Sequence, residues 1–583
     1  MSEKASRRGF LATIAATGTV AGGFALGGTS APAANAATAG ACTSSLPPVE
    51  LGKNDPRYQE LNTRGYNARF SGQPESLVVV HSAKQIARVV TEAVRAGKRI
   101  VVRGGGHCFE GLVDDPAVQV LIDISEMNNV HFDEKHKAFS VEAGARLGHV
   151  YRTLYLNWGV TVPGGSCPGV GVGGHVSGGG YGMLSHRDGL VVDHLYGVEV
   201  VVVDKSGRAR IVVATREAGD PHRDLWWAHT GGGGGNFGIV TRYLFRAPDA
   251  TGNTPETLLP KPPAQVLVTQ VHWSWPDLTE ATFNRLVSNY GRLQRAAAGP
   301  ANSPILDSSL TMFHADSGTI QLFVTADGTD PNAEGSVWAF VQAVGEGVGP
   351  QPFVEYWVNA LWMRMSTSYD STPFYLRFKS KAGYLREPWS DRQISAIYRY
   401  LAQTPANAGS AVYLLRYGGK INSVRPDATA TPHRDSCMIA FYDIGWYDPA
   451  EDAARLASIR GLYQEVYSDT GGVPAPNTAS DGAYINYPDT DLADPALNTS
   501  GIPWHTLYYK DNYPKLQQVK AKWDPRNVFQ HALSVQPPGV RARDLAAPAS
   551  PAAPASKGRV QTPAPKSYPK PKPPRHVGVF DGL

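Results

Sequence analysis

The stretch that decides the fold is Pro163-Gly164-Gly165-Ser166-Cys167-Pro168-Gly169-Val170-Gly171-Val172-Gly173-Gly174-His175, which continues to Gly178, Gly179, Gly180, Tyr181 and Gly182. Glycine has no Cβ, so a loop this rich in glycine lets the backbone approach a large flat ligand closely. Cys167 lies inside the loop, whereas structural free cysteines usually lie in apolar runs. A disulfide with Cys42, Cys108 or Cys437 is the alternative for Cys167, and composition does not separate the two.

Two further glycine clusters lie on either side of this loop, at residues 104–106 and 231–235. The first follows a predicted strand and leaves backbone N–H groups bare, an arrangement that binds anions such as phosphates; a plain tight turn is the alternative. No helix follows it at once, so it matches neither a Walker A loop nor the G-x-G-x-x-G of dinucleotide-binding folds. A standard NAD or P-loop site is therefore not expected.

Apolar periodicity predicts the elements around these clusters. A β-α-β unit is expected from a strand at 77–80, a helix capped by Ser82 and ended by Gly97, and a strand at 99–102. Further strands are expected at 118–124 and 139–143. The middle of the chain alternates strands at 266–273, 308–313 and 319–325 with helices near 283–293 and 333–345, and a last helix is expected at 512–523.

Several separated motifs, in this order, resemble the vanillyl-alcohol-oxidase fold of FAD flavoproteins. They are Arg103 to His107, the loop around Cys167, Asp224-Leu225-Trp226-Trp227, and residues 231–240. The stretch Tyr484-Ile485-Asn486-Tyr487-Pro488-Asp489, with residues 511–516 and 524–529, resembles the berberine-bridge-enzyme-like branch of that fold. The resemblance covers residues 60–540 and implies FAD as cofactor.

The fold class implied is α+β, with a two-part FAD-binding domain of the vanillyl-alcohol-oxidase (PCMH) type. We expect its first part at 60–250 and its completing, berberine-bridge-like segment at 476–540. Between them, an α/β substrate domain is expected at 251–475. The Ala/Pro/Lys-rich end, 541–583, is expected to be a disordered tail.

In that branch a histidine closing the first glycine run bonds the flavin 8α-methyl, and a cysteine in the Gly-Gly-Ser-Cys loop bonds flavin C6. His107 and Cys167 hold these positions, so the resemblance implies a bicovalent flavoprotein. Cys108 is expected to be packed or disulfide-bonded, although a second thiol near the flavin is the other possibility. Asn486 is a flavin contact or a buried turn amide. The remaining cofactor contacts expected are Arg103, Gly104, Gly105, Gly106, Gly171, Gly174, His175, Gly178, Ile239 and Val240.

Oxidation of an alcohol also needs a base for the hydroxyl proton. In the carbohydrate-oxidising members the second tyrosine of Tyr-x-Asn-Tyr takes this role, and Tyr487 matches it. A phenol of pKa ~10 needs help from its neighbours to act as a base. Tyr417 is the second candidate, with Tyr413 beside it as a packing residue. If 484–487 is extended, Tyr484 shares a face with Asn486 and not with Tyr487.

Charge and composition limit the kinds of partner that the protein can be expected to bind. The 583 residues carry a formal net charge of +4, but residues 1–39 carry +2 and 541–583 carry +6, which leaves −4 for 40–540. An acidic core argues against nucleic acid as a partner. Four cysteines are too few for a disulfide scaffold. His175 and His186 lack neighbours with ligand spacing, so no metal site is expected.

The N-terminus has the pattern of a twin-arginine export signal at 1–39. Arg7 and Arg8 precede a weakly apolar stretch, and Ala34-Asn35-Ala36 and Ala37-Thr38-Ala39 have the form of cleavage sites. The export machinery is thus an expected partner, and the mature protein is expected to be secreted. Since no other stretch approaches 18 apolar residues, we expect no membrane span in it.

Together these features predict an FAD-dependent oxidase. The expected substrate is an alcohol or hemiacetal of a sugar, an oligosaccharide or a glycosylated secondary metabolite, which becomes a carbonyl while O₂ becomes H₂O₂. One rival is a same-fold oxidoreductase that acts on a non-sugar metabolite or uses another acceptor. The other is a metabolite-binding protein of the flavin fold without activity.

Overall fold

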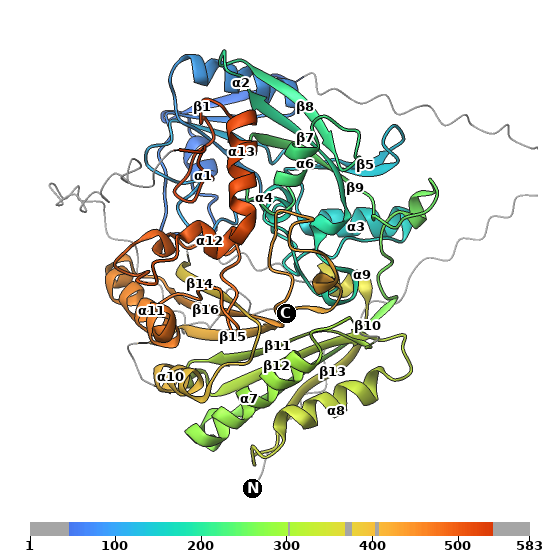
Figure 1. The fold of residues 1–583 in the computed structure, drawn as a ribbon, viewed down its shortest axis with the longest axis vertical. Coiled ribbons are helices and arrows are strands. Elements are labelled where there is room, and N and C mark those ends of the chain that lie inside the picture. The colour runs from blue at the N-terminus through green and yellow to red at the C-terminus, as the bar shows by residue number, and fades with distance from the viewer. Residues whose placement is uncertain (1–45, 301–302, 368–375, 403–406, 540–583) are drawn as a thin grey trace, which may run out of the picture. The chain divides into compact units, whose positions relative to one another are not determined.

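In the computed structural model the β-α-β unit predicted from apolar periodicity follows a first strand, β1 (Val49–Gly52), and a short helix, α1 (Tyr58–Asn62) (Figure 1). It consists of β2 (Ser76–Val79), α2 (Ala83–Arg95) and β3 (Ile100–Arg103). The Ser82 hydroxyl accepts the Gln85 N–H at the start of α2, and Gly97 leaves the helix with φ +65°. One face of α2 is buried, as its spacing predicted, through Ile86, Val89, Val90 and Ala93.

The structure describes residues 46–300, 303–367, 376–402 and 407–539. The predicted export signal, the C-terminal tail and Cys42 lie outside these residues. No helix within the described ranges is both long and apolar enough to cross a membrane.

Two sheets form the region that carries the glycine clusters. The first is four-stranded and mixed: β2 pairs antiparallel with an edge strand, while β2 and β3 both run parallel to a central strand. The second is antiparallel and five-stranded. In sheet order, the four-stranded sheet is β1 (Val49–Gly52), β2, β4 (Val120–Asp123) and β3, and the five-stranded sheet is β5 (Val130–Asp133), β6 (Ala138–Glu142), β9 (Ile239–Phe245), β7 (Leu195–Val203) and β8 (Ala209–Thr215).

Between these strands, short helices position the loops. They are α3 (Leu147–Trp158), α4 (Val172–Ser177), which starts inside the glycine-rich loop, α5 (Ser185–Asp188) and α6 (Arg223–Ala228).

The middle of the chain forms one antiparallel seven-stranded sheet. The strands predicted at 266–273, 308–313 and 319–325 are confirmed as its members β10, β11 and β12. Its order is β13 (Phe353–Leu361), β10 (Gln265–Ser274), β12 (Thr319–Asp327), β11 (Ile305–Phe313), β15 (Ser410–Arg416), β16 (Met438–Trp446) and β14 (Arg377–Leu385).

Helices cover one face of this sheet, as Figure 1 shows for α7, α8 and α10. The two predicted helices are confirmed as α7 and α8. The set is α7 (Glu280–Ala296), α8 (Ala333–Gly345), α10 (Asp391–Ala402) and α11 (Asp452–Val466). The other face carries residues that line the cavity described below.

The C-terminal segment returns to the first region of the chain. Its helices are α12 (Trp504–Tyr509) and α13 (Tyr513–Trp523), and α13 packs against α6. The buried Lys520 ammonium donates to the Asn236 carbonyl oxygen at 2.7 Å and pairs with Asp524 at 2.7 Å. The Val535 N–H donates to the Asn236 side chain at 2.9 Å, so residues far apart in sequence complete one structure around the third glycine cluster.

Candidate active site

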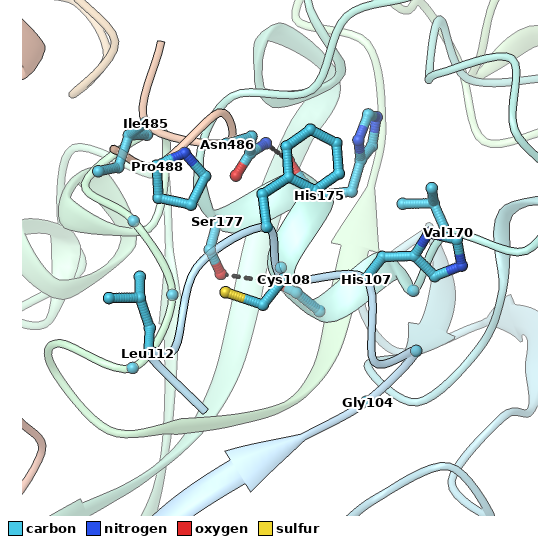
Figure 2. A pocket seen from close by; sticks show the side chains of 18 of the residues that line it. Gly104, His107, Cys108, Leu112, Val170, His175, Ser177, Ile485, Asn486 and Pro488 are labelled. Carbon is cyan, nitrogen blue, oxygen red and sulfur yellow. Dashed lines mark hydrogen bonds between the residues drawn. The ribbon is translucent and has the colours of Figure 1, made fainter. Parts of the chain in front are cut away.

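A cavity of about 360 Å³ brings the three glycine clusters together (Figure 2). Residues 103–109, 165–167, 170–171, 173–175 and 233–235 line it from the first region, and 484–488 line it from the C-terminal segment. The seven-stranded sheet closes it with Asp307, Ser309, Leu415 and Arg416.

Two of the glycine loops touch backbone to backbone. A Cβ placed on Gly105 would lie 2.4 Å from the Gly171 nitrogen, and a Cβ on Gly171 would lie 2.4 Å from the Gly105 nitrogen. Any side chain at either position would force the loops apart. A Cβ on Gly174, by contrast, would meet no atom within 4 Å. Gly105 and Gly171 thus fix the floor of a cradle, and Gly174 lines its open space.

His107 and Cys167 both line this cavity, on different loops. The His107 ring stacks on Tyr66, with centroids 4.4 Å apart and planes at 19°. The Cys167 loop is fixed by hydrogen bonds: the Tyr151 hydroxyl donates to the Gly165 oxygen at 2.6 Å, and the Gly165 N–H donates to His175 Nε2 at 3.1 Å. Burial lowers the pKa of His175 to about 4, so its ring is neutral and Nε2 can accept.

Cys108, next to His107, also lines the cavity. Within the described residues neither Cys108 nor Cys437 forms a disulfide, so the disulfide alternative for Cys108 is wrong there. Burial raises the pKa of Cys108 to about 12, which keeps the thiol protonated and unreactive.

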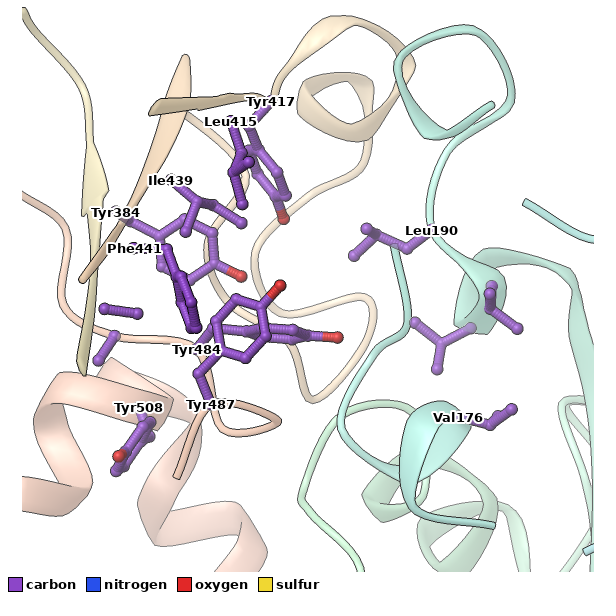
Figure 3. Close-up of a cluster of buried hydrophobic side chains, with 14 of the residues drawn as sticks. Val176, Leu190, Tyr384, Leu415, Tyr417, Ile439, Phe441, Tyr484, Tyr487 and Tyr508 are labelled. Atoms are coloured by element: carbon purple, nitrogen blue, oxygen red, sulfur yellow. The ribbon is translucent and has the colours of Figure 1, made fainter. Parts of the chain in front are cut away.

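Residues 484–487 form a turn and not the extended segment that we considered. The Tyr487 N–H donates to the Tyr484 oxygen at 2.9 Å. Because the chain reverses here, the rings of Tyr484 and Tyr487 meet edge to face with centroids 5.1 Å apart (Figure 3). The Asn486 amide nitrogen donates to the His175 oxygen and to the Tyr484 hydroxyl, both at 2.8 Å. Asn486 is therefore a turn amide that also lines the cavity.

Tyr487 has a partner that sequence reasoning missed. The hydroxyls of Tyr487 and Tyr181 lie 2.5 Å apart, and both residues line the cavity. The Tyr487 ring stacks on Phe109 at 5.7 Å and 8°. Burial raises the pKa of Tyr487 above its ordinary value, and its hydrogen bond with Tyr181 opposes that shift. The position of Tyr181 directly after the glycines at 178–180 was the available signal.

Tyr417, the second predicted base, does not line the cavity. It follows the end of β15, and its buried hydroxyl donates to the His433 oxygen at 3.1 Å. Its ring packs against Tyr384 and Tyr181, with centroids 5.1 Å and 6.2 Å apart. Figure 3 shows it beside Leu415, away from the turn that carries Tyr487. Tyr413 is buried on β15 against Phe441 and is absent from the lining as well.

Two of the residues expected to contact the cofactor, Arg103 and Gly178, contact other residues of the protein. Arg103 borders the cavity, but its buried guanidinium pairs with Asp123 at 3.0 Å. Gly178 is not in the lining, because its missing Cβ makes room for the Asn486 side chain, which would lie 2.0 Å from that Cβ. The other expected positions do line the cavity: Gly104, Gly105, Gly106, His107, Cys167, Gly171, Gly174, His175, Ile239, Val240 and Asn486.

This geometry fits an elongated, flat cofactor lying on a glycine cradle. Comparison with known proteins agrees. Residues 74–210 match the family model "FAD binding domain", and residues 483–536 match "Berberine and berberine like". Over 545 residues the chain is 53% identical to aclacinomycin-N/aclacinomycin-A oxidase of Streptomyces galilaeus, covering 92% of this chain and 99% of that protein. The chain belongs to the berberine-bridge-enzyme-like family of FAD flavoproteins.

Other members of the family are similar over most of their length. Hexose oxidase of Chondrus crispus is 30% identical over 541 residues, covering 83% of this chain and 94% of that one. A glycopeptide hexose oxidase, solved in complex with teicoplanin, superposes with a TM-score of 0.80 at 49% identity, covering 84% of this chain and 99% of that chain. The protein is thus an FAD-dependent oxidoreductase with a vanillyl-alcohol-oxidase-type α+β fold.

In this berberine-bridge-like protein the wall formed by the seven-stranded sheet carries charged residues that sequence reasoning missed. Asp307 lies at a bulge in β11, and Arg416 ends the neighbouring strand β15. Burial raises the pKa of Asp307 to about 7, although the Arg416 guanidinium opposes the shift. The Arg416 guanidinium contacts the His186 ring at 3.2 Å. Asp307 is the one charged residue of β11, and that was the available signal for it.

Among the residues that the structure describes, no three His, Cys, Asp or Glu side chains group closely enough to hold a metal ion. His175 and His186 are instead bound to backbone and to Arg416.

Proposed function

We propose that this protein oxidises a CH–OH group of a sugar, or of a sugar carried by a secondary metabolite, to a carbonyl, and that O₂ is reduced to H₂O₂. One observation carries the proposal: the Tyr181–Tyr487 hydroxyl pair opens into the same cavity as His107 and Cys167. The substrates named for the relatives, aclacinomycin and hexoses, support the substrate class. The oxidation releases two electrons and two protons, which is what reduction of one O₂ to H₂O₂ consumes.

We propose that His107 and Cys167 both bond the cofactor, at the flavin 8α-methyl and at C6. Their positions on two walls of one cavity support this, together with the family resemblance. When bound there, FAD supplies the acceptor for a hydride from the substrate carbon. Two covalent bonds would hold the flavin firmly while leaving the sheet-side wall of the cavity for the substrate.

Tyr487 takes the hydroxyl proton of the substrate in this proposal. Its raised pKa keeps it protonated at rest, so it accepts that proton while passing its own along the 2.5 Å hydrogen bond to Tyr181. Asp307 lies in the same cavity and can take the proton from the pair. The surrounding rings exclude water, so the hydroxyl pair needs no reorganisation of solvent during the transfer.

The test compares two tyrosines that each lose one oxygen. Tyr487→Phe should slow anaerobic reduction of the flavin by glycosylated substrate ~10²–10⁴-fold, the range for loss of a general base, with little change in binding. Tyr417→Phe is the matched control and should stay within a few-fold of the parent. In the parent, acid-precipitated protein should keep its yellow colour.

Each rival has its own outcome in the same assays. Flavin that washes out of the acid-precipitated parent would overturn the bicovalent attachment. Substrate that bleaches the flavin without O₂ uptake would point to another electron acceptor, and a failure of every sugar-containing compound to bleach it would favour the binding-protein rival. Equal rates for Tyr487→Phe and the parent would move the base elsewhere.

We further propose that residues 1–39 direct export of the folded protein by the twin-arginine route, on the strength of Arg7 and Arg8 ahead of the apolar stretch. This route carries folded proteins, so the cofactor can be attached before export.

A further inference from the structure

Six charged side chains form a cluster outside the lining of the cavity; five of them are buried, and the sixth, that of Arg460, is 35% exposed. Three are cations and three are carboxylates, so the cluster is balanced. They come from four separate segments: the loop after His107, strand β14, helix α11, and the segment after Tyr487. The members of this charge cluster are Glu110, Lys379, Lys381, Arg460, Asp489 and Asp491.

Lys379 is the member that joins two loops of the candidate active site. Its ammonium bonds Glu110 and, at 2.7 Å, Asp489. All three side chains are at most 4% exposed, so solvent does not screen these contacts. Lys381 differs, because it bonds Asp489 at 2.6 Å and Asp491 at 2.9 Å without reaching the loop after His107.

The two loops that Lys379 joins carry the proposed tether and the proposed base. Glu110 lies three residues after His107, and Asp489 lies two residues after Tyr487. A ladder of rings runs in parallel: His107 stacks on Tyr66, with Phe109 6.1 Å from Tyr66 and Tyr487 stacked on Phe109. Ring packing and the Lys379 ammonium thus both link the His107 loop to the turn that carries Tyr487.

The free energy of unfolding alone gives little reason to bury ion pairs such as those of Lys379. Buried ion pairs seldom add more than well-packed apolar residues of the same volume would, since desolvation offsets the attraction. What they do supply is geometry, because each partner must meet the other at hydrogen-bond distance. Burial would lower the pKa of Lys379, but the surrounding carboxylates raise it above its ordinary value, so the ammonium stays charged.

We propose that Lys379 is a positioning residue, which holds the His107 loop and the Tyr487 turn at the separation that flavin attachment and proton removal both require. The inference rests on the proposed function, because it takes His107 as a tether and Tyr487 as the base. It assigns to the inserted middle region, through β14, a role in assembling the cofactor site as well as the substrate wall.

The sharpest test replaces two carboxylates of the cluster by amides. Glu110→Gln weakens the link to the His107 loop while Lys379 keeps Asp489. Asp491→Asn is the matched control, because Asp491 is similarly buried, lies outside the His107 loop and bonds Lys381 and Arg460 at 2.9 Å and 2.7 Å, with Lys379 farther away at 3.6 Å. Three quantities are measured on the FAD-loaded proteins: the unfolding temperature, the fraction of flavin that survives acid precipitation, and the anaerobic reduction rate.

We expect both variants to unfold at a lower temperature than the parent. Only Glu110→Gln should lose attached flavin, to half or less of the parent fraction. Its flavin should also be reduced ~10-fold more slowly, with unchanged substrate affinity. Equal attachment and equal rates in the two variants would overturn the proposal and leave the cluster a purely structural feature. These outcomes are read relative to the parent; a parent without attached flavin would instead count against the proposed function.

Lys379 itself provides a second test. Lys379→Met keeps the volume and removes the charge, whereas Lys379→Arg keeps the charge and should restore most of the attachment. If Lys379→Met fails to fold, Lys379→Met combined with Glu110→Gln leaves the two loops unlinked without an unpaired Glu110 charge. Full flavin attachment in that double variant would contradict the positioning role.

Discussion

At the scale of single residues, burial of the two tyrosines opposes the ionisation that a base requires. Tyr487 and Tyr181 sit among aromatic rings, and that burial raises the pKa of both phenols, so neither ionises at rest. A proton arriving at the pair must therefore leave it in the same event. Asp307 fits that task, because a group with a pKa of about 7 changes charge near neutral pH.

This yields a prediction for pH dependence. Only ionised Asp307 can accept a proton, so the anaerobic reduction rate of the parent should rise as pH increases through about 7. Asp307→Asn should abolish that limb and lower the rate above it by ~10²-fold, the low end of the range for base catalysis. Ser309→Ala, on the same strand and lining the same wall, is the control. A pH profile that is unchanged in Asp307→Asn would refute the assignment.

The sequence located His107, Cys167 and Tyr487 through motifs, but it could not locate Tyr181 or Asp307. Each has a local signal in the sequence, but its partners lie more than a hundred residues away, and no local pattern identifies those partners. Tyr417 shows the converse. Its tyrosine-glycine-glycine context was suggestive, yet its hydroxyl is committed to the His433 backbone, which only the packing of β15 reveals.

At the scale of elements, the contact between two glycine loops is the feature with the sharpest consequence. Helix and strand positions followed from apolar periodicity because each is a local pattern, and α2, α7, α8 and β10 all formed where it placed them. The turn at 484–487 did not follow, since a tyrosine-rich stretch reads equally well as a strand. The meeting of Gly105 with Gly171 was also beyond a local reading.

Gly105→Ala tests that meeting. The new Cβ would lie 2.4 Å from the Gly171 nitrogen, so the loops must separate, at a cost of roughly 1–3 kcal/mol. We expect a lower unfolding temperature together with loss of attached flavin. Gly461→Ala in α11 makes the same chemical change where no atom lies within 4 Å, and should stabilise the helix by roughly 1 kcal/mol. Normal flavin content in Gly105→Ala would show that the cradle tolerates a wider spacing.

At the scale of the whole molecule, the cavity draws on residues from Tyr66 to His531. The family resemblance predicted that the first and last segments share one cofactor site. It did not predict that β14, from the middle region, would supply the cations between them, because buried lysines carry no sequence signature.

The proposed export also belongs to this scale, because the twin-arginine route carries proteins that have already folded. Replacing Arg7 and Arg8 together by lysine should trap a precursor inside the cell, with its flavin already attached. Fractionation and absorbance of the trapped protein provide the measurement. Secretion of that variant at the parent level would show that the N-terminal segment has another role.

The seven-stranded sheet has one face toward the helices and one toward the cavity. Adjacent residues on a strand therefore pack in different surroundings. On β11 the Ser308 hydroxyl accepts from Gln294 of α7 at 3.0 Å, while its neighbour Ser309 lines the cavity. The cavity-facing residues, at every second position, can be substituted without disturbing the packing of the sheet against the helices. Substitutions at the cavity-facing positions can thus change which compound is oxidised, while the helix-facing positions keep the scaffold. We expect new substrate specificities in this family to arise by substitutions at every second position along these strands.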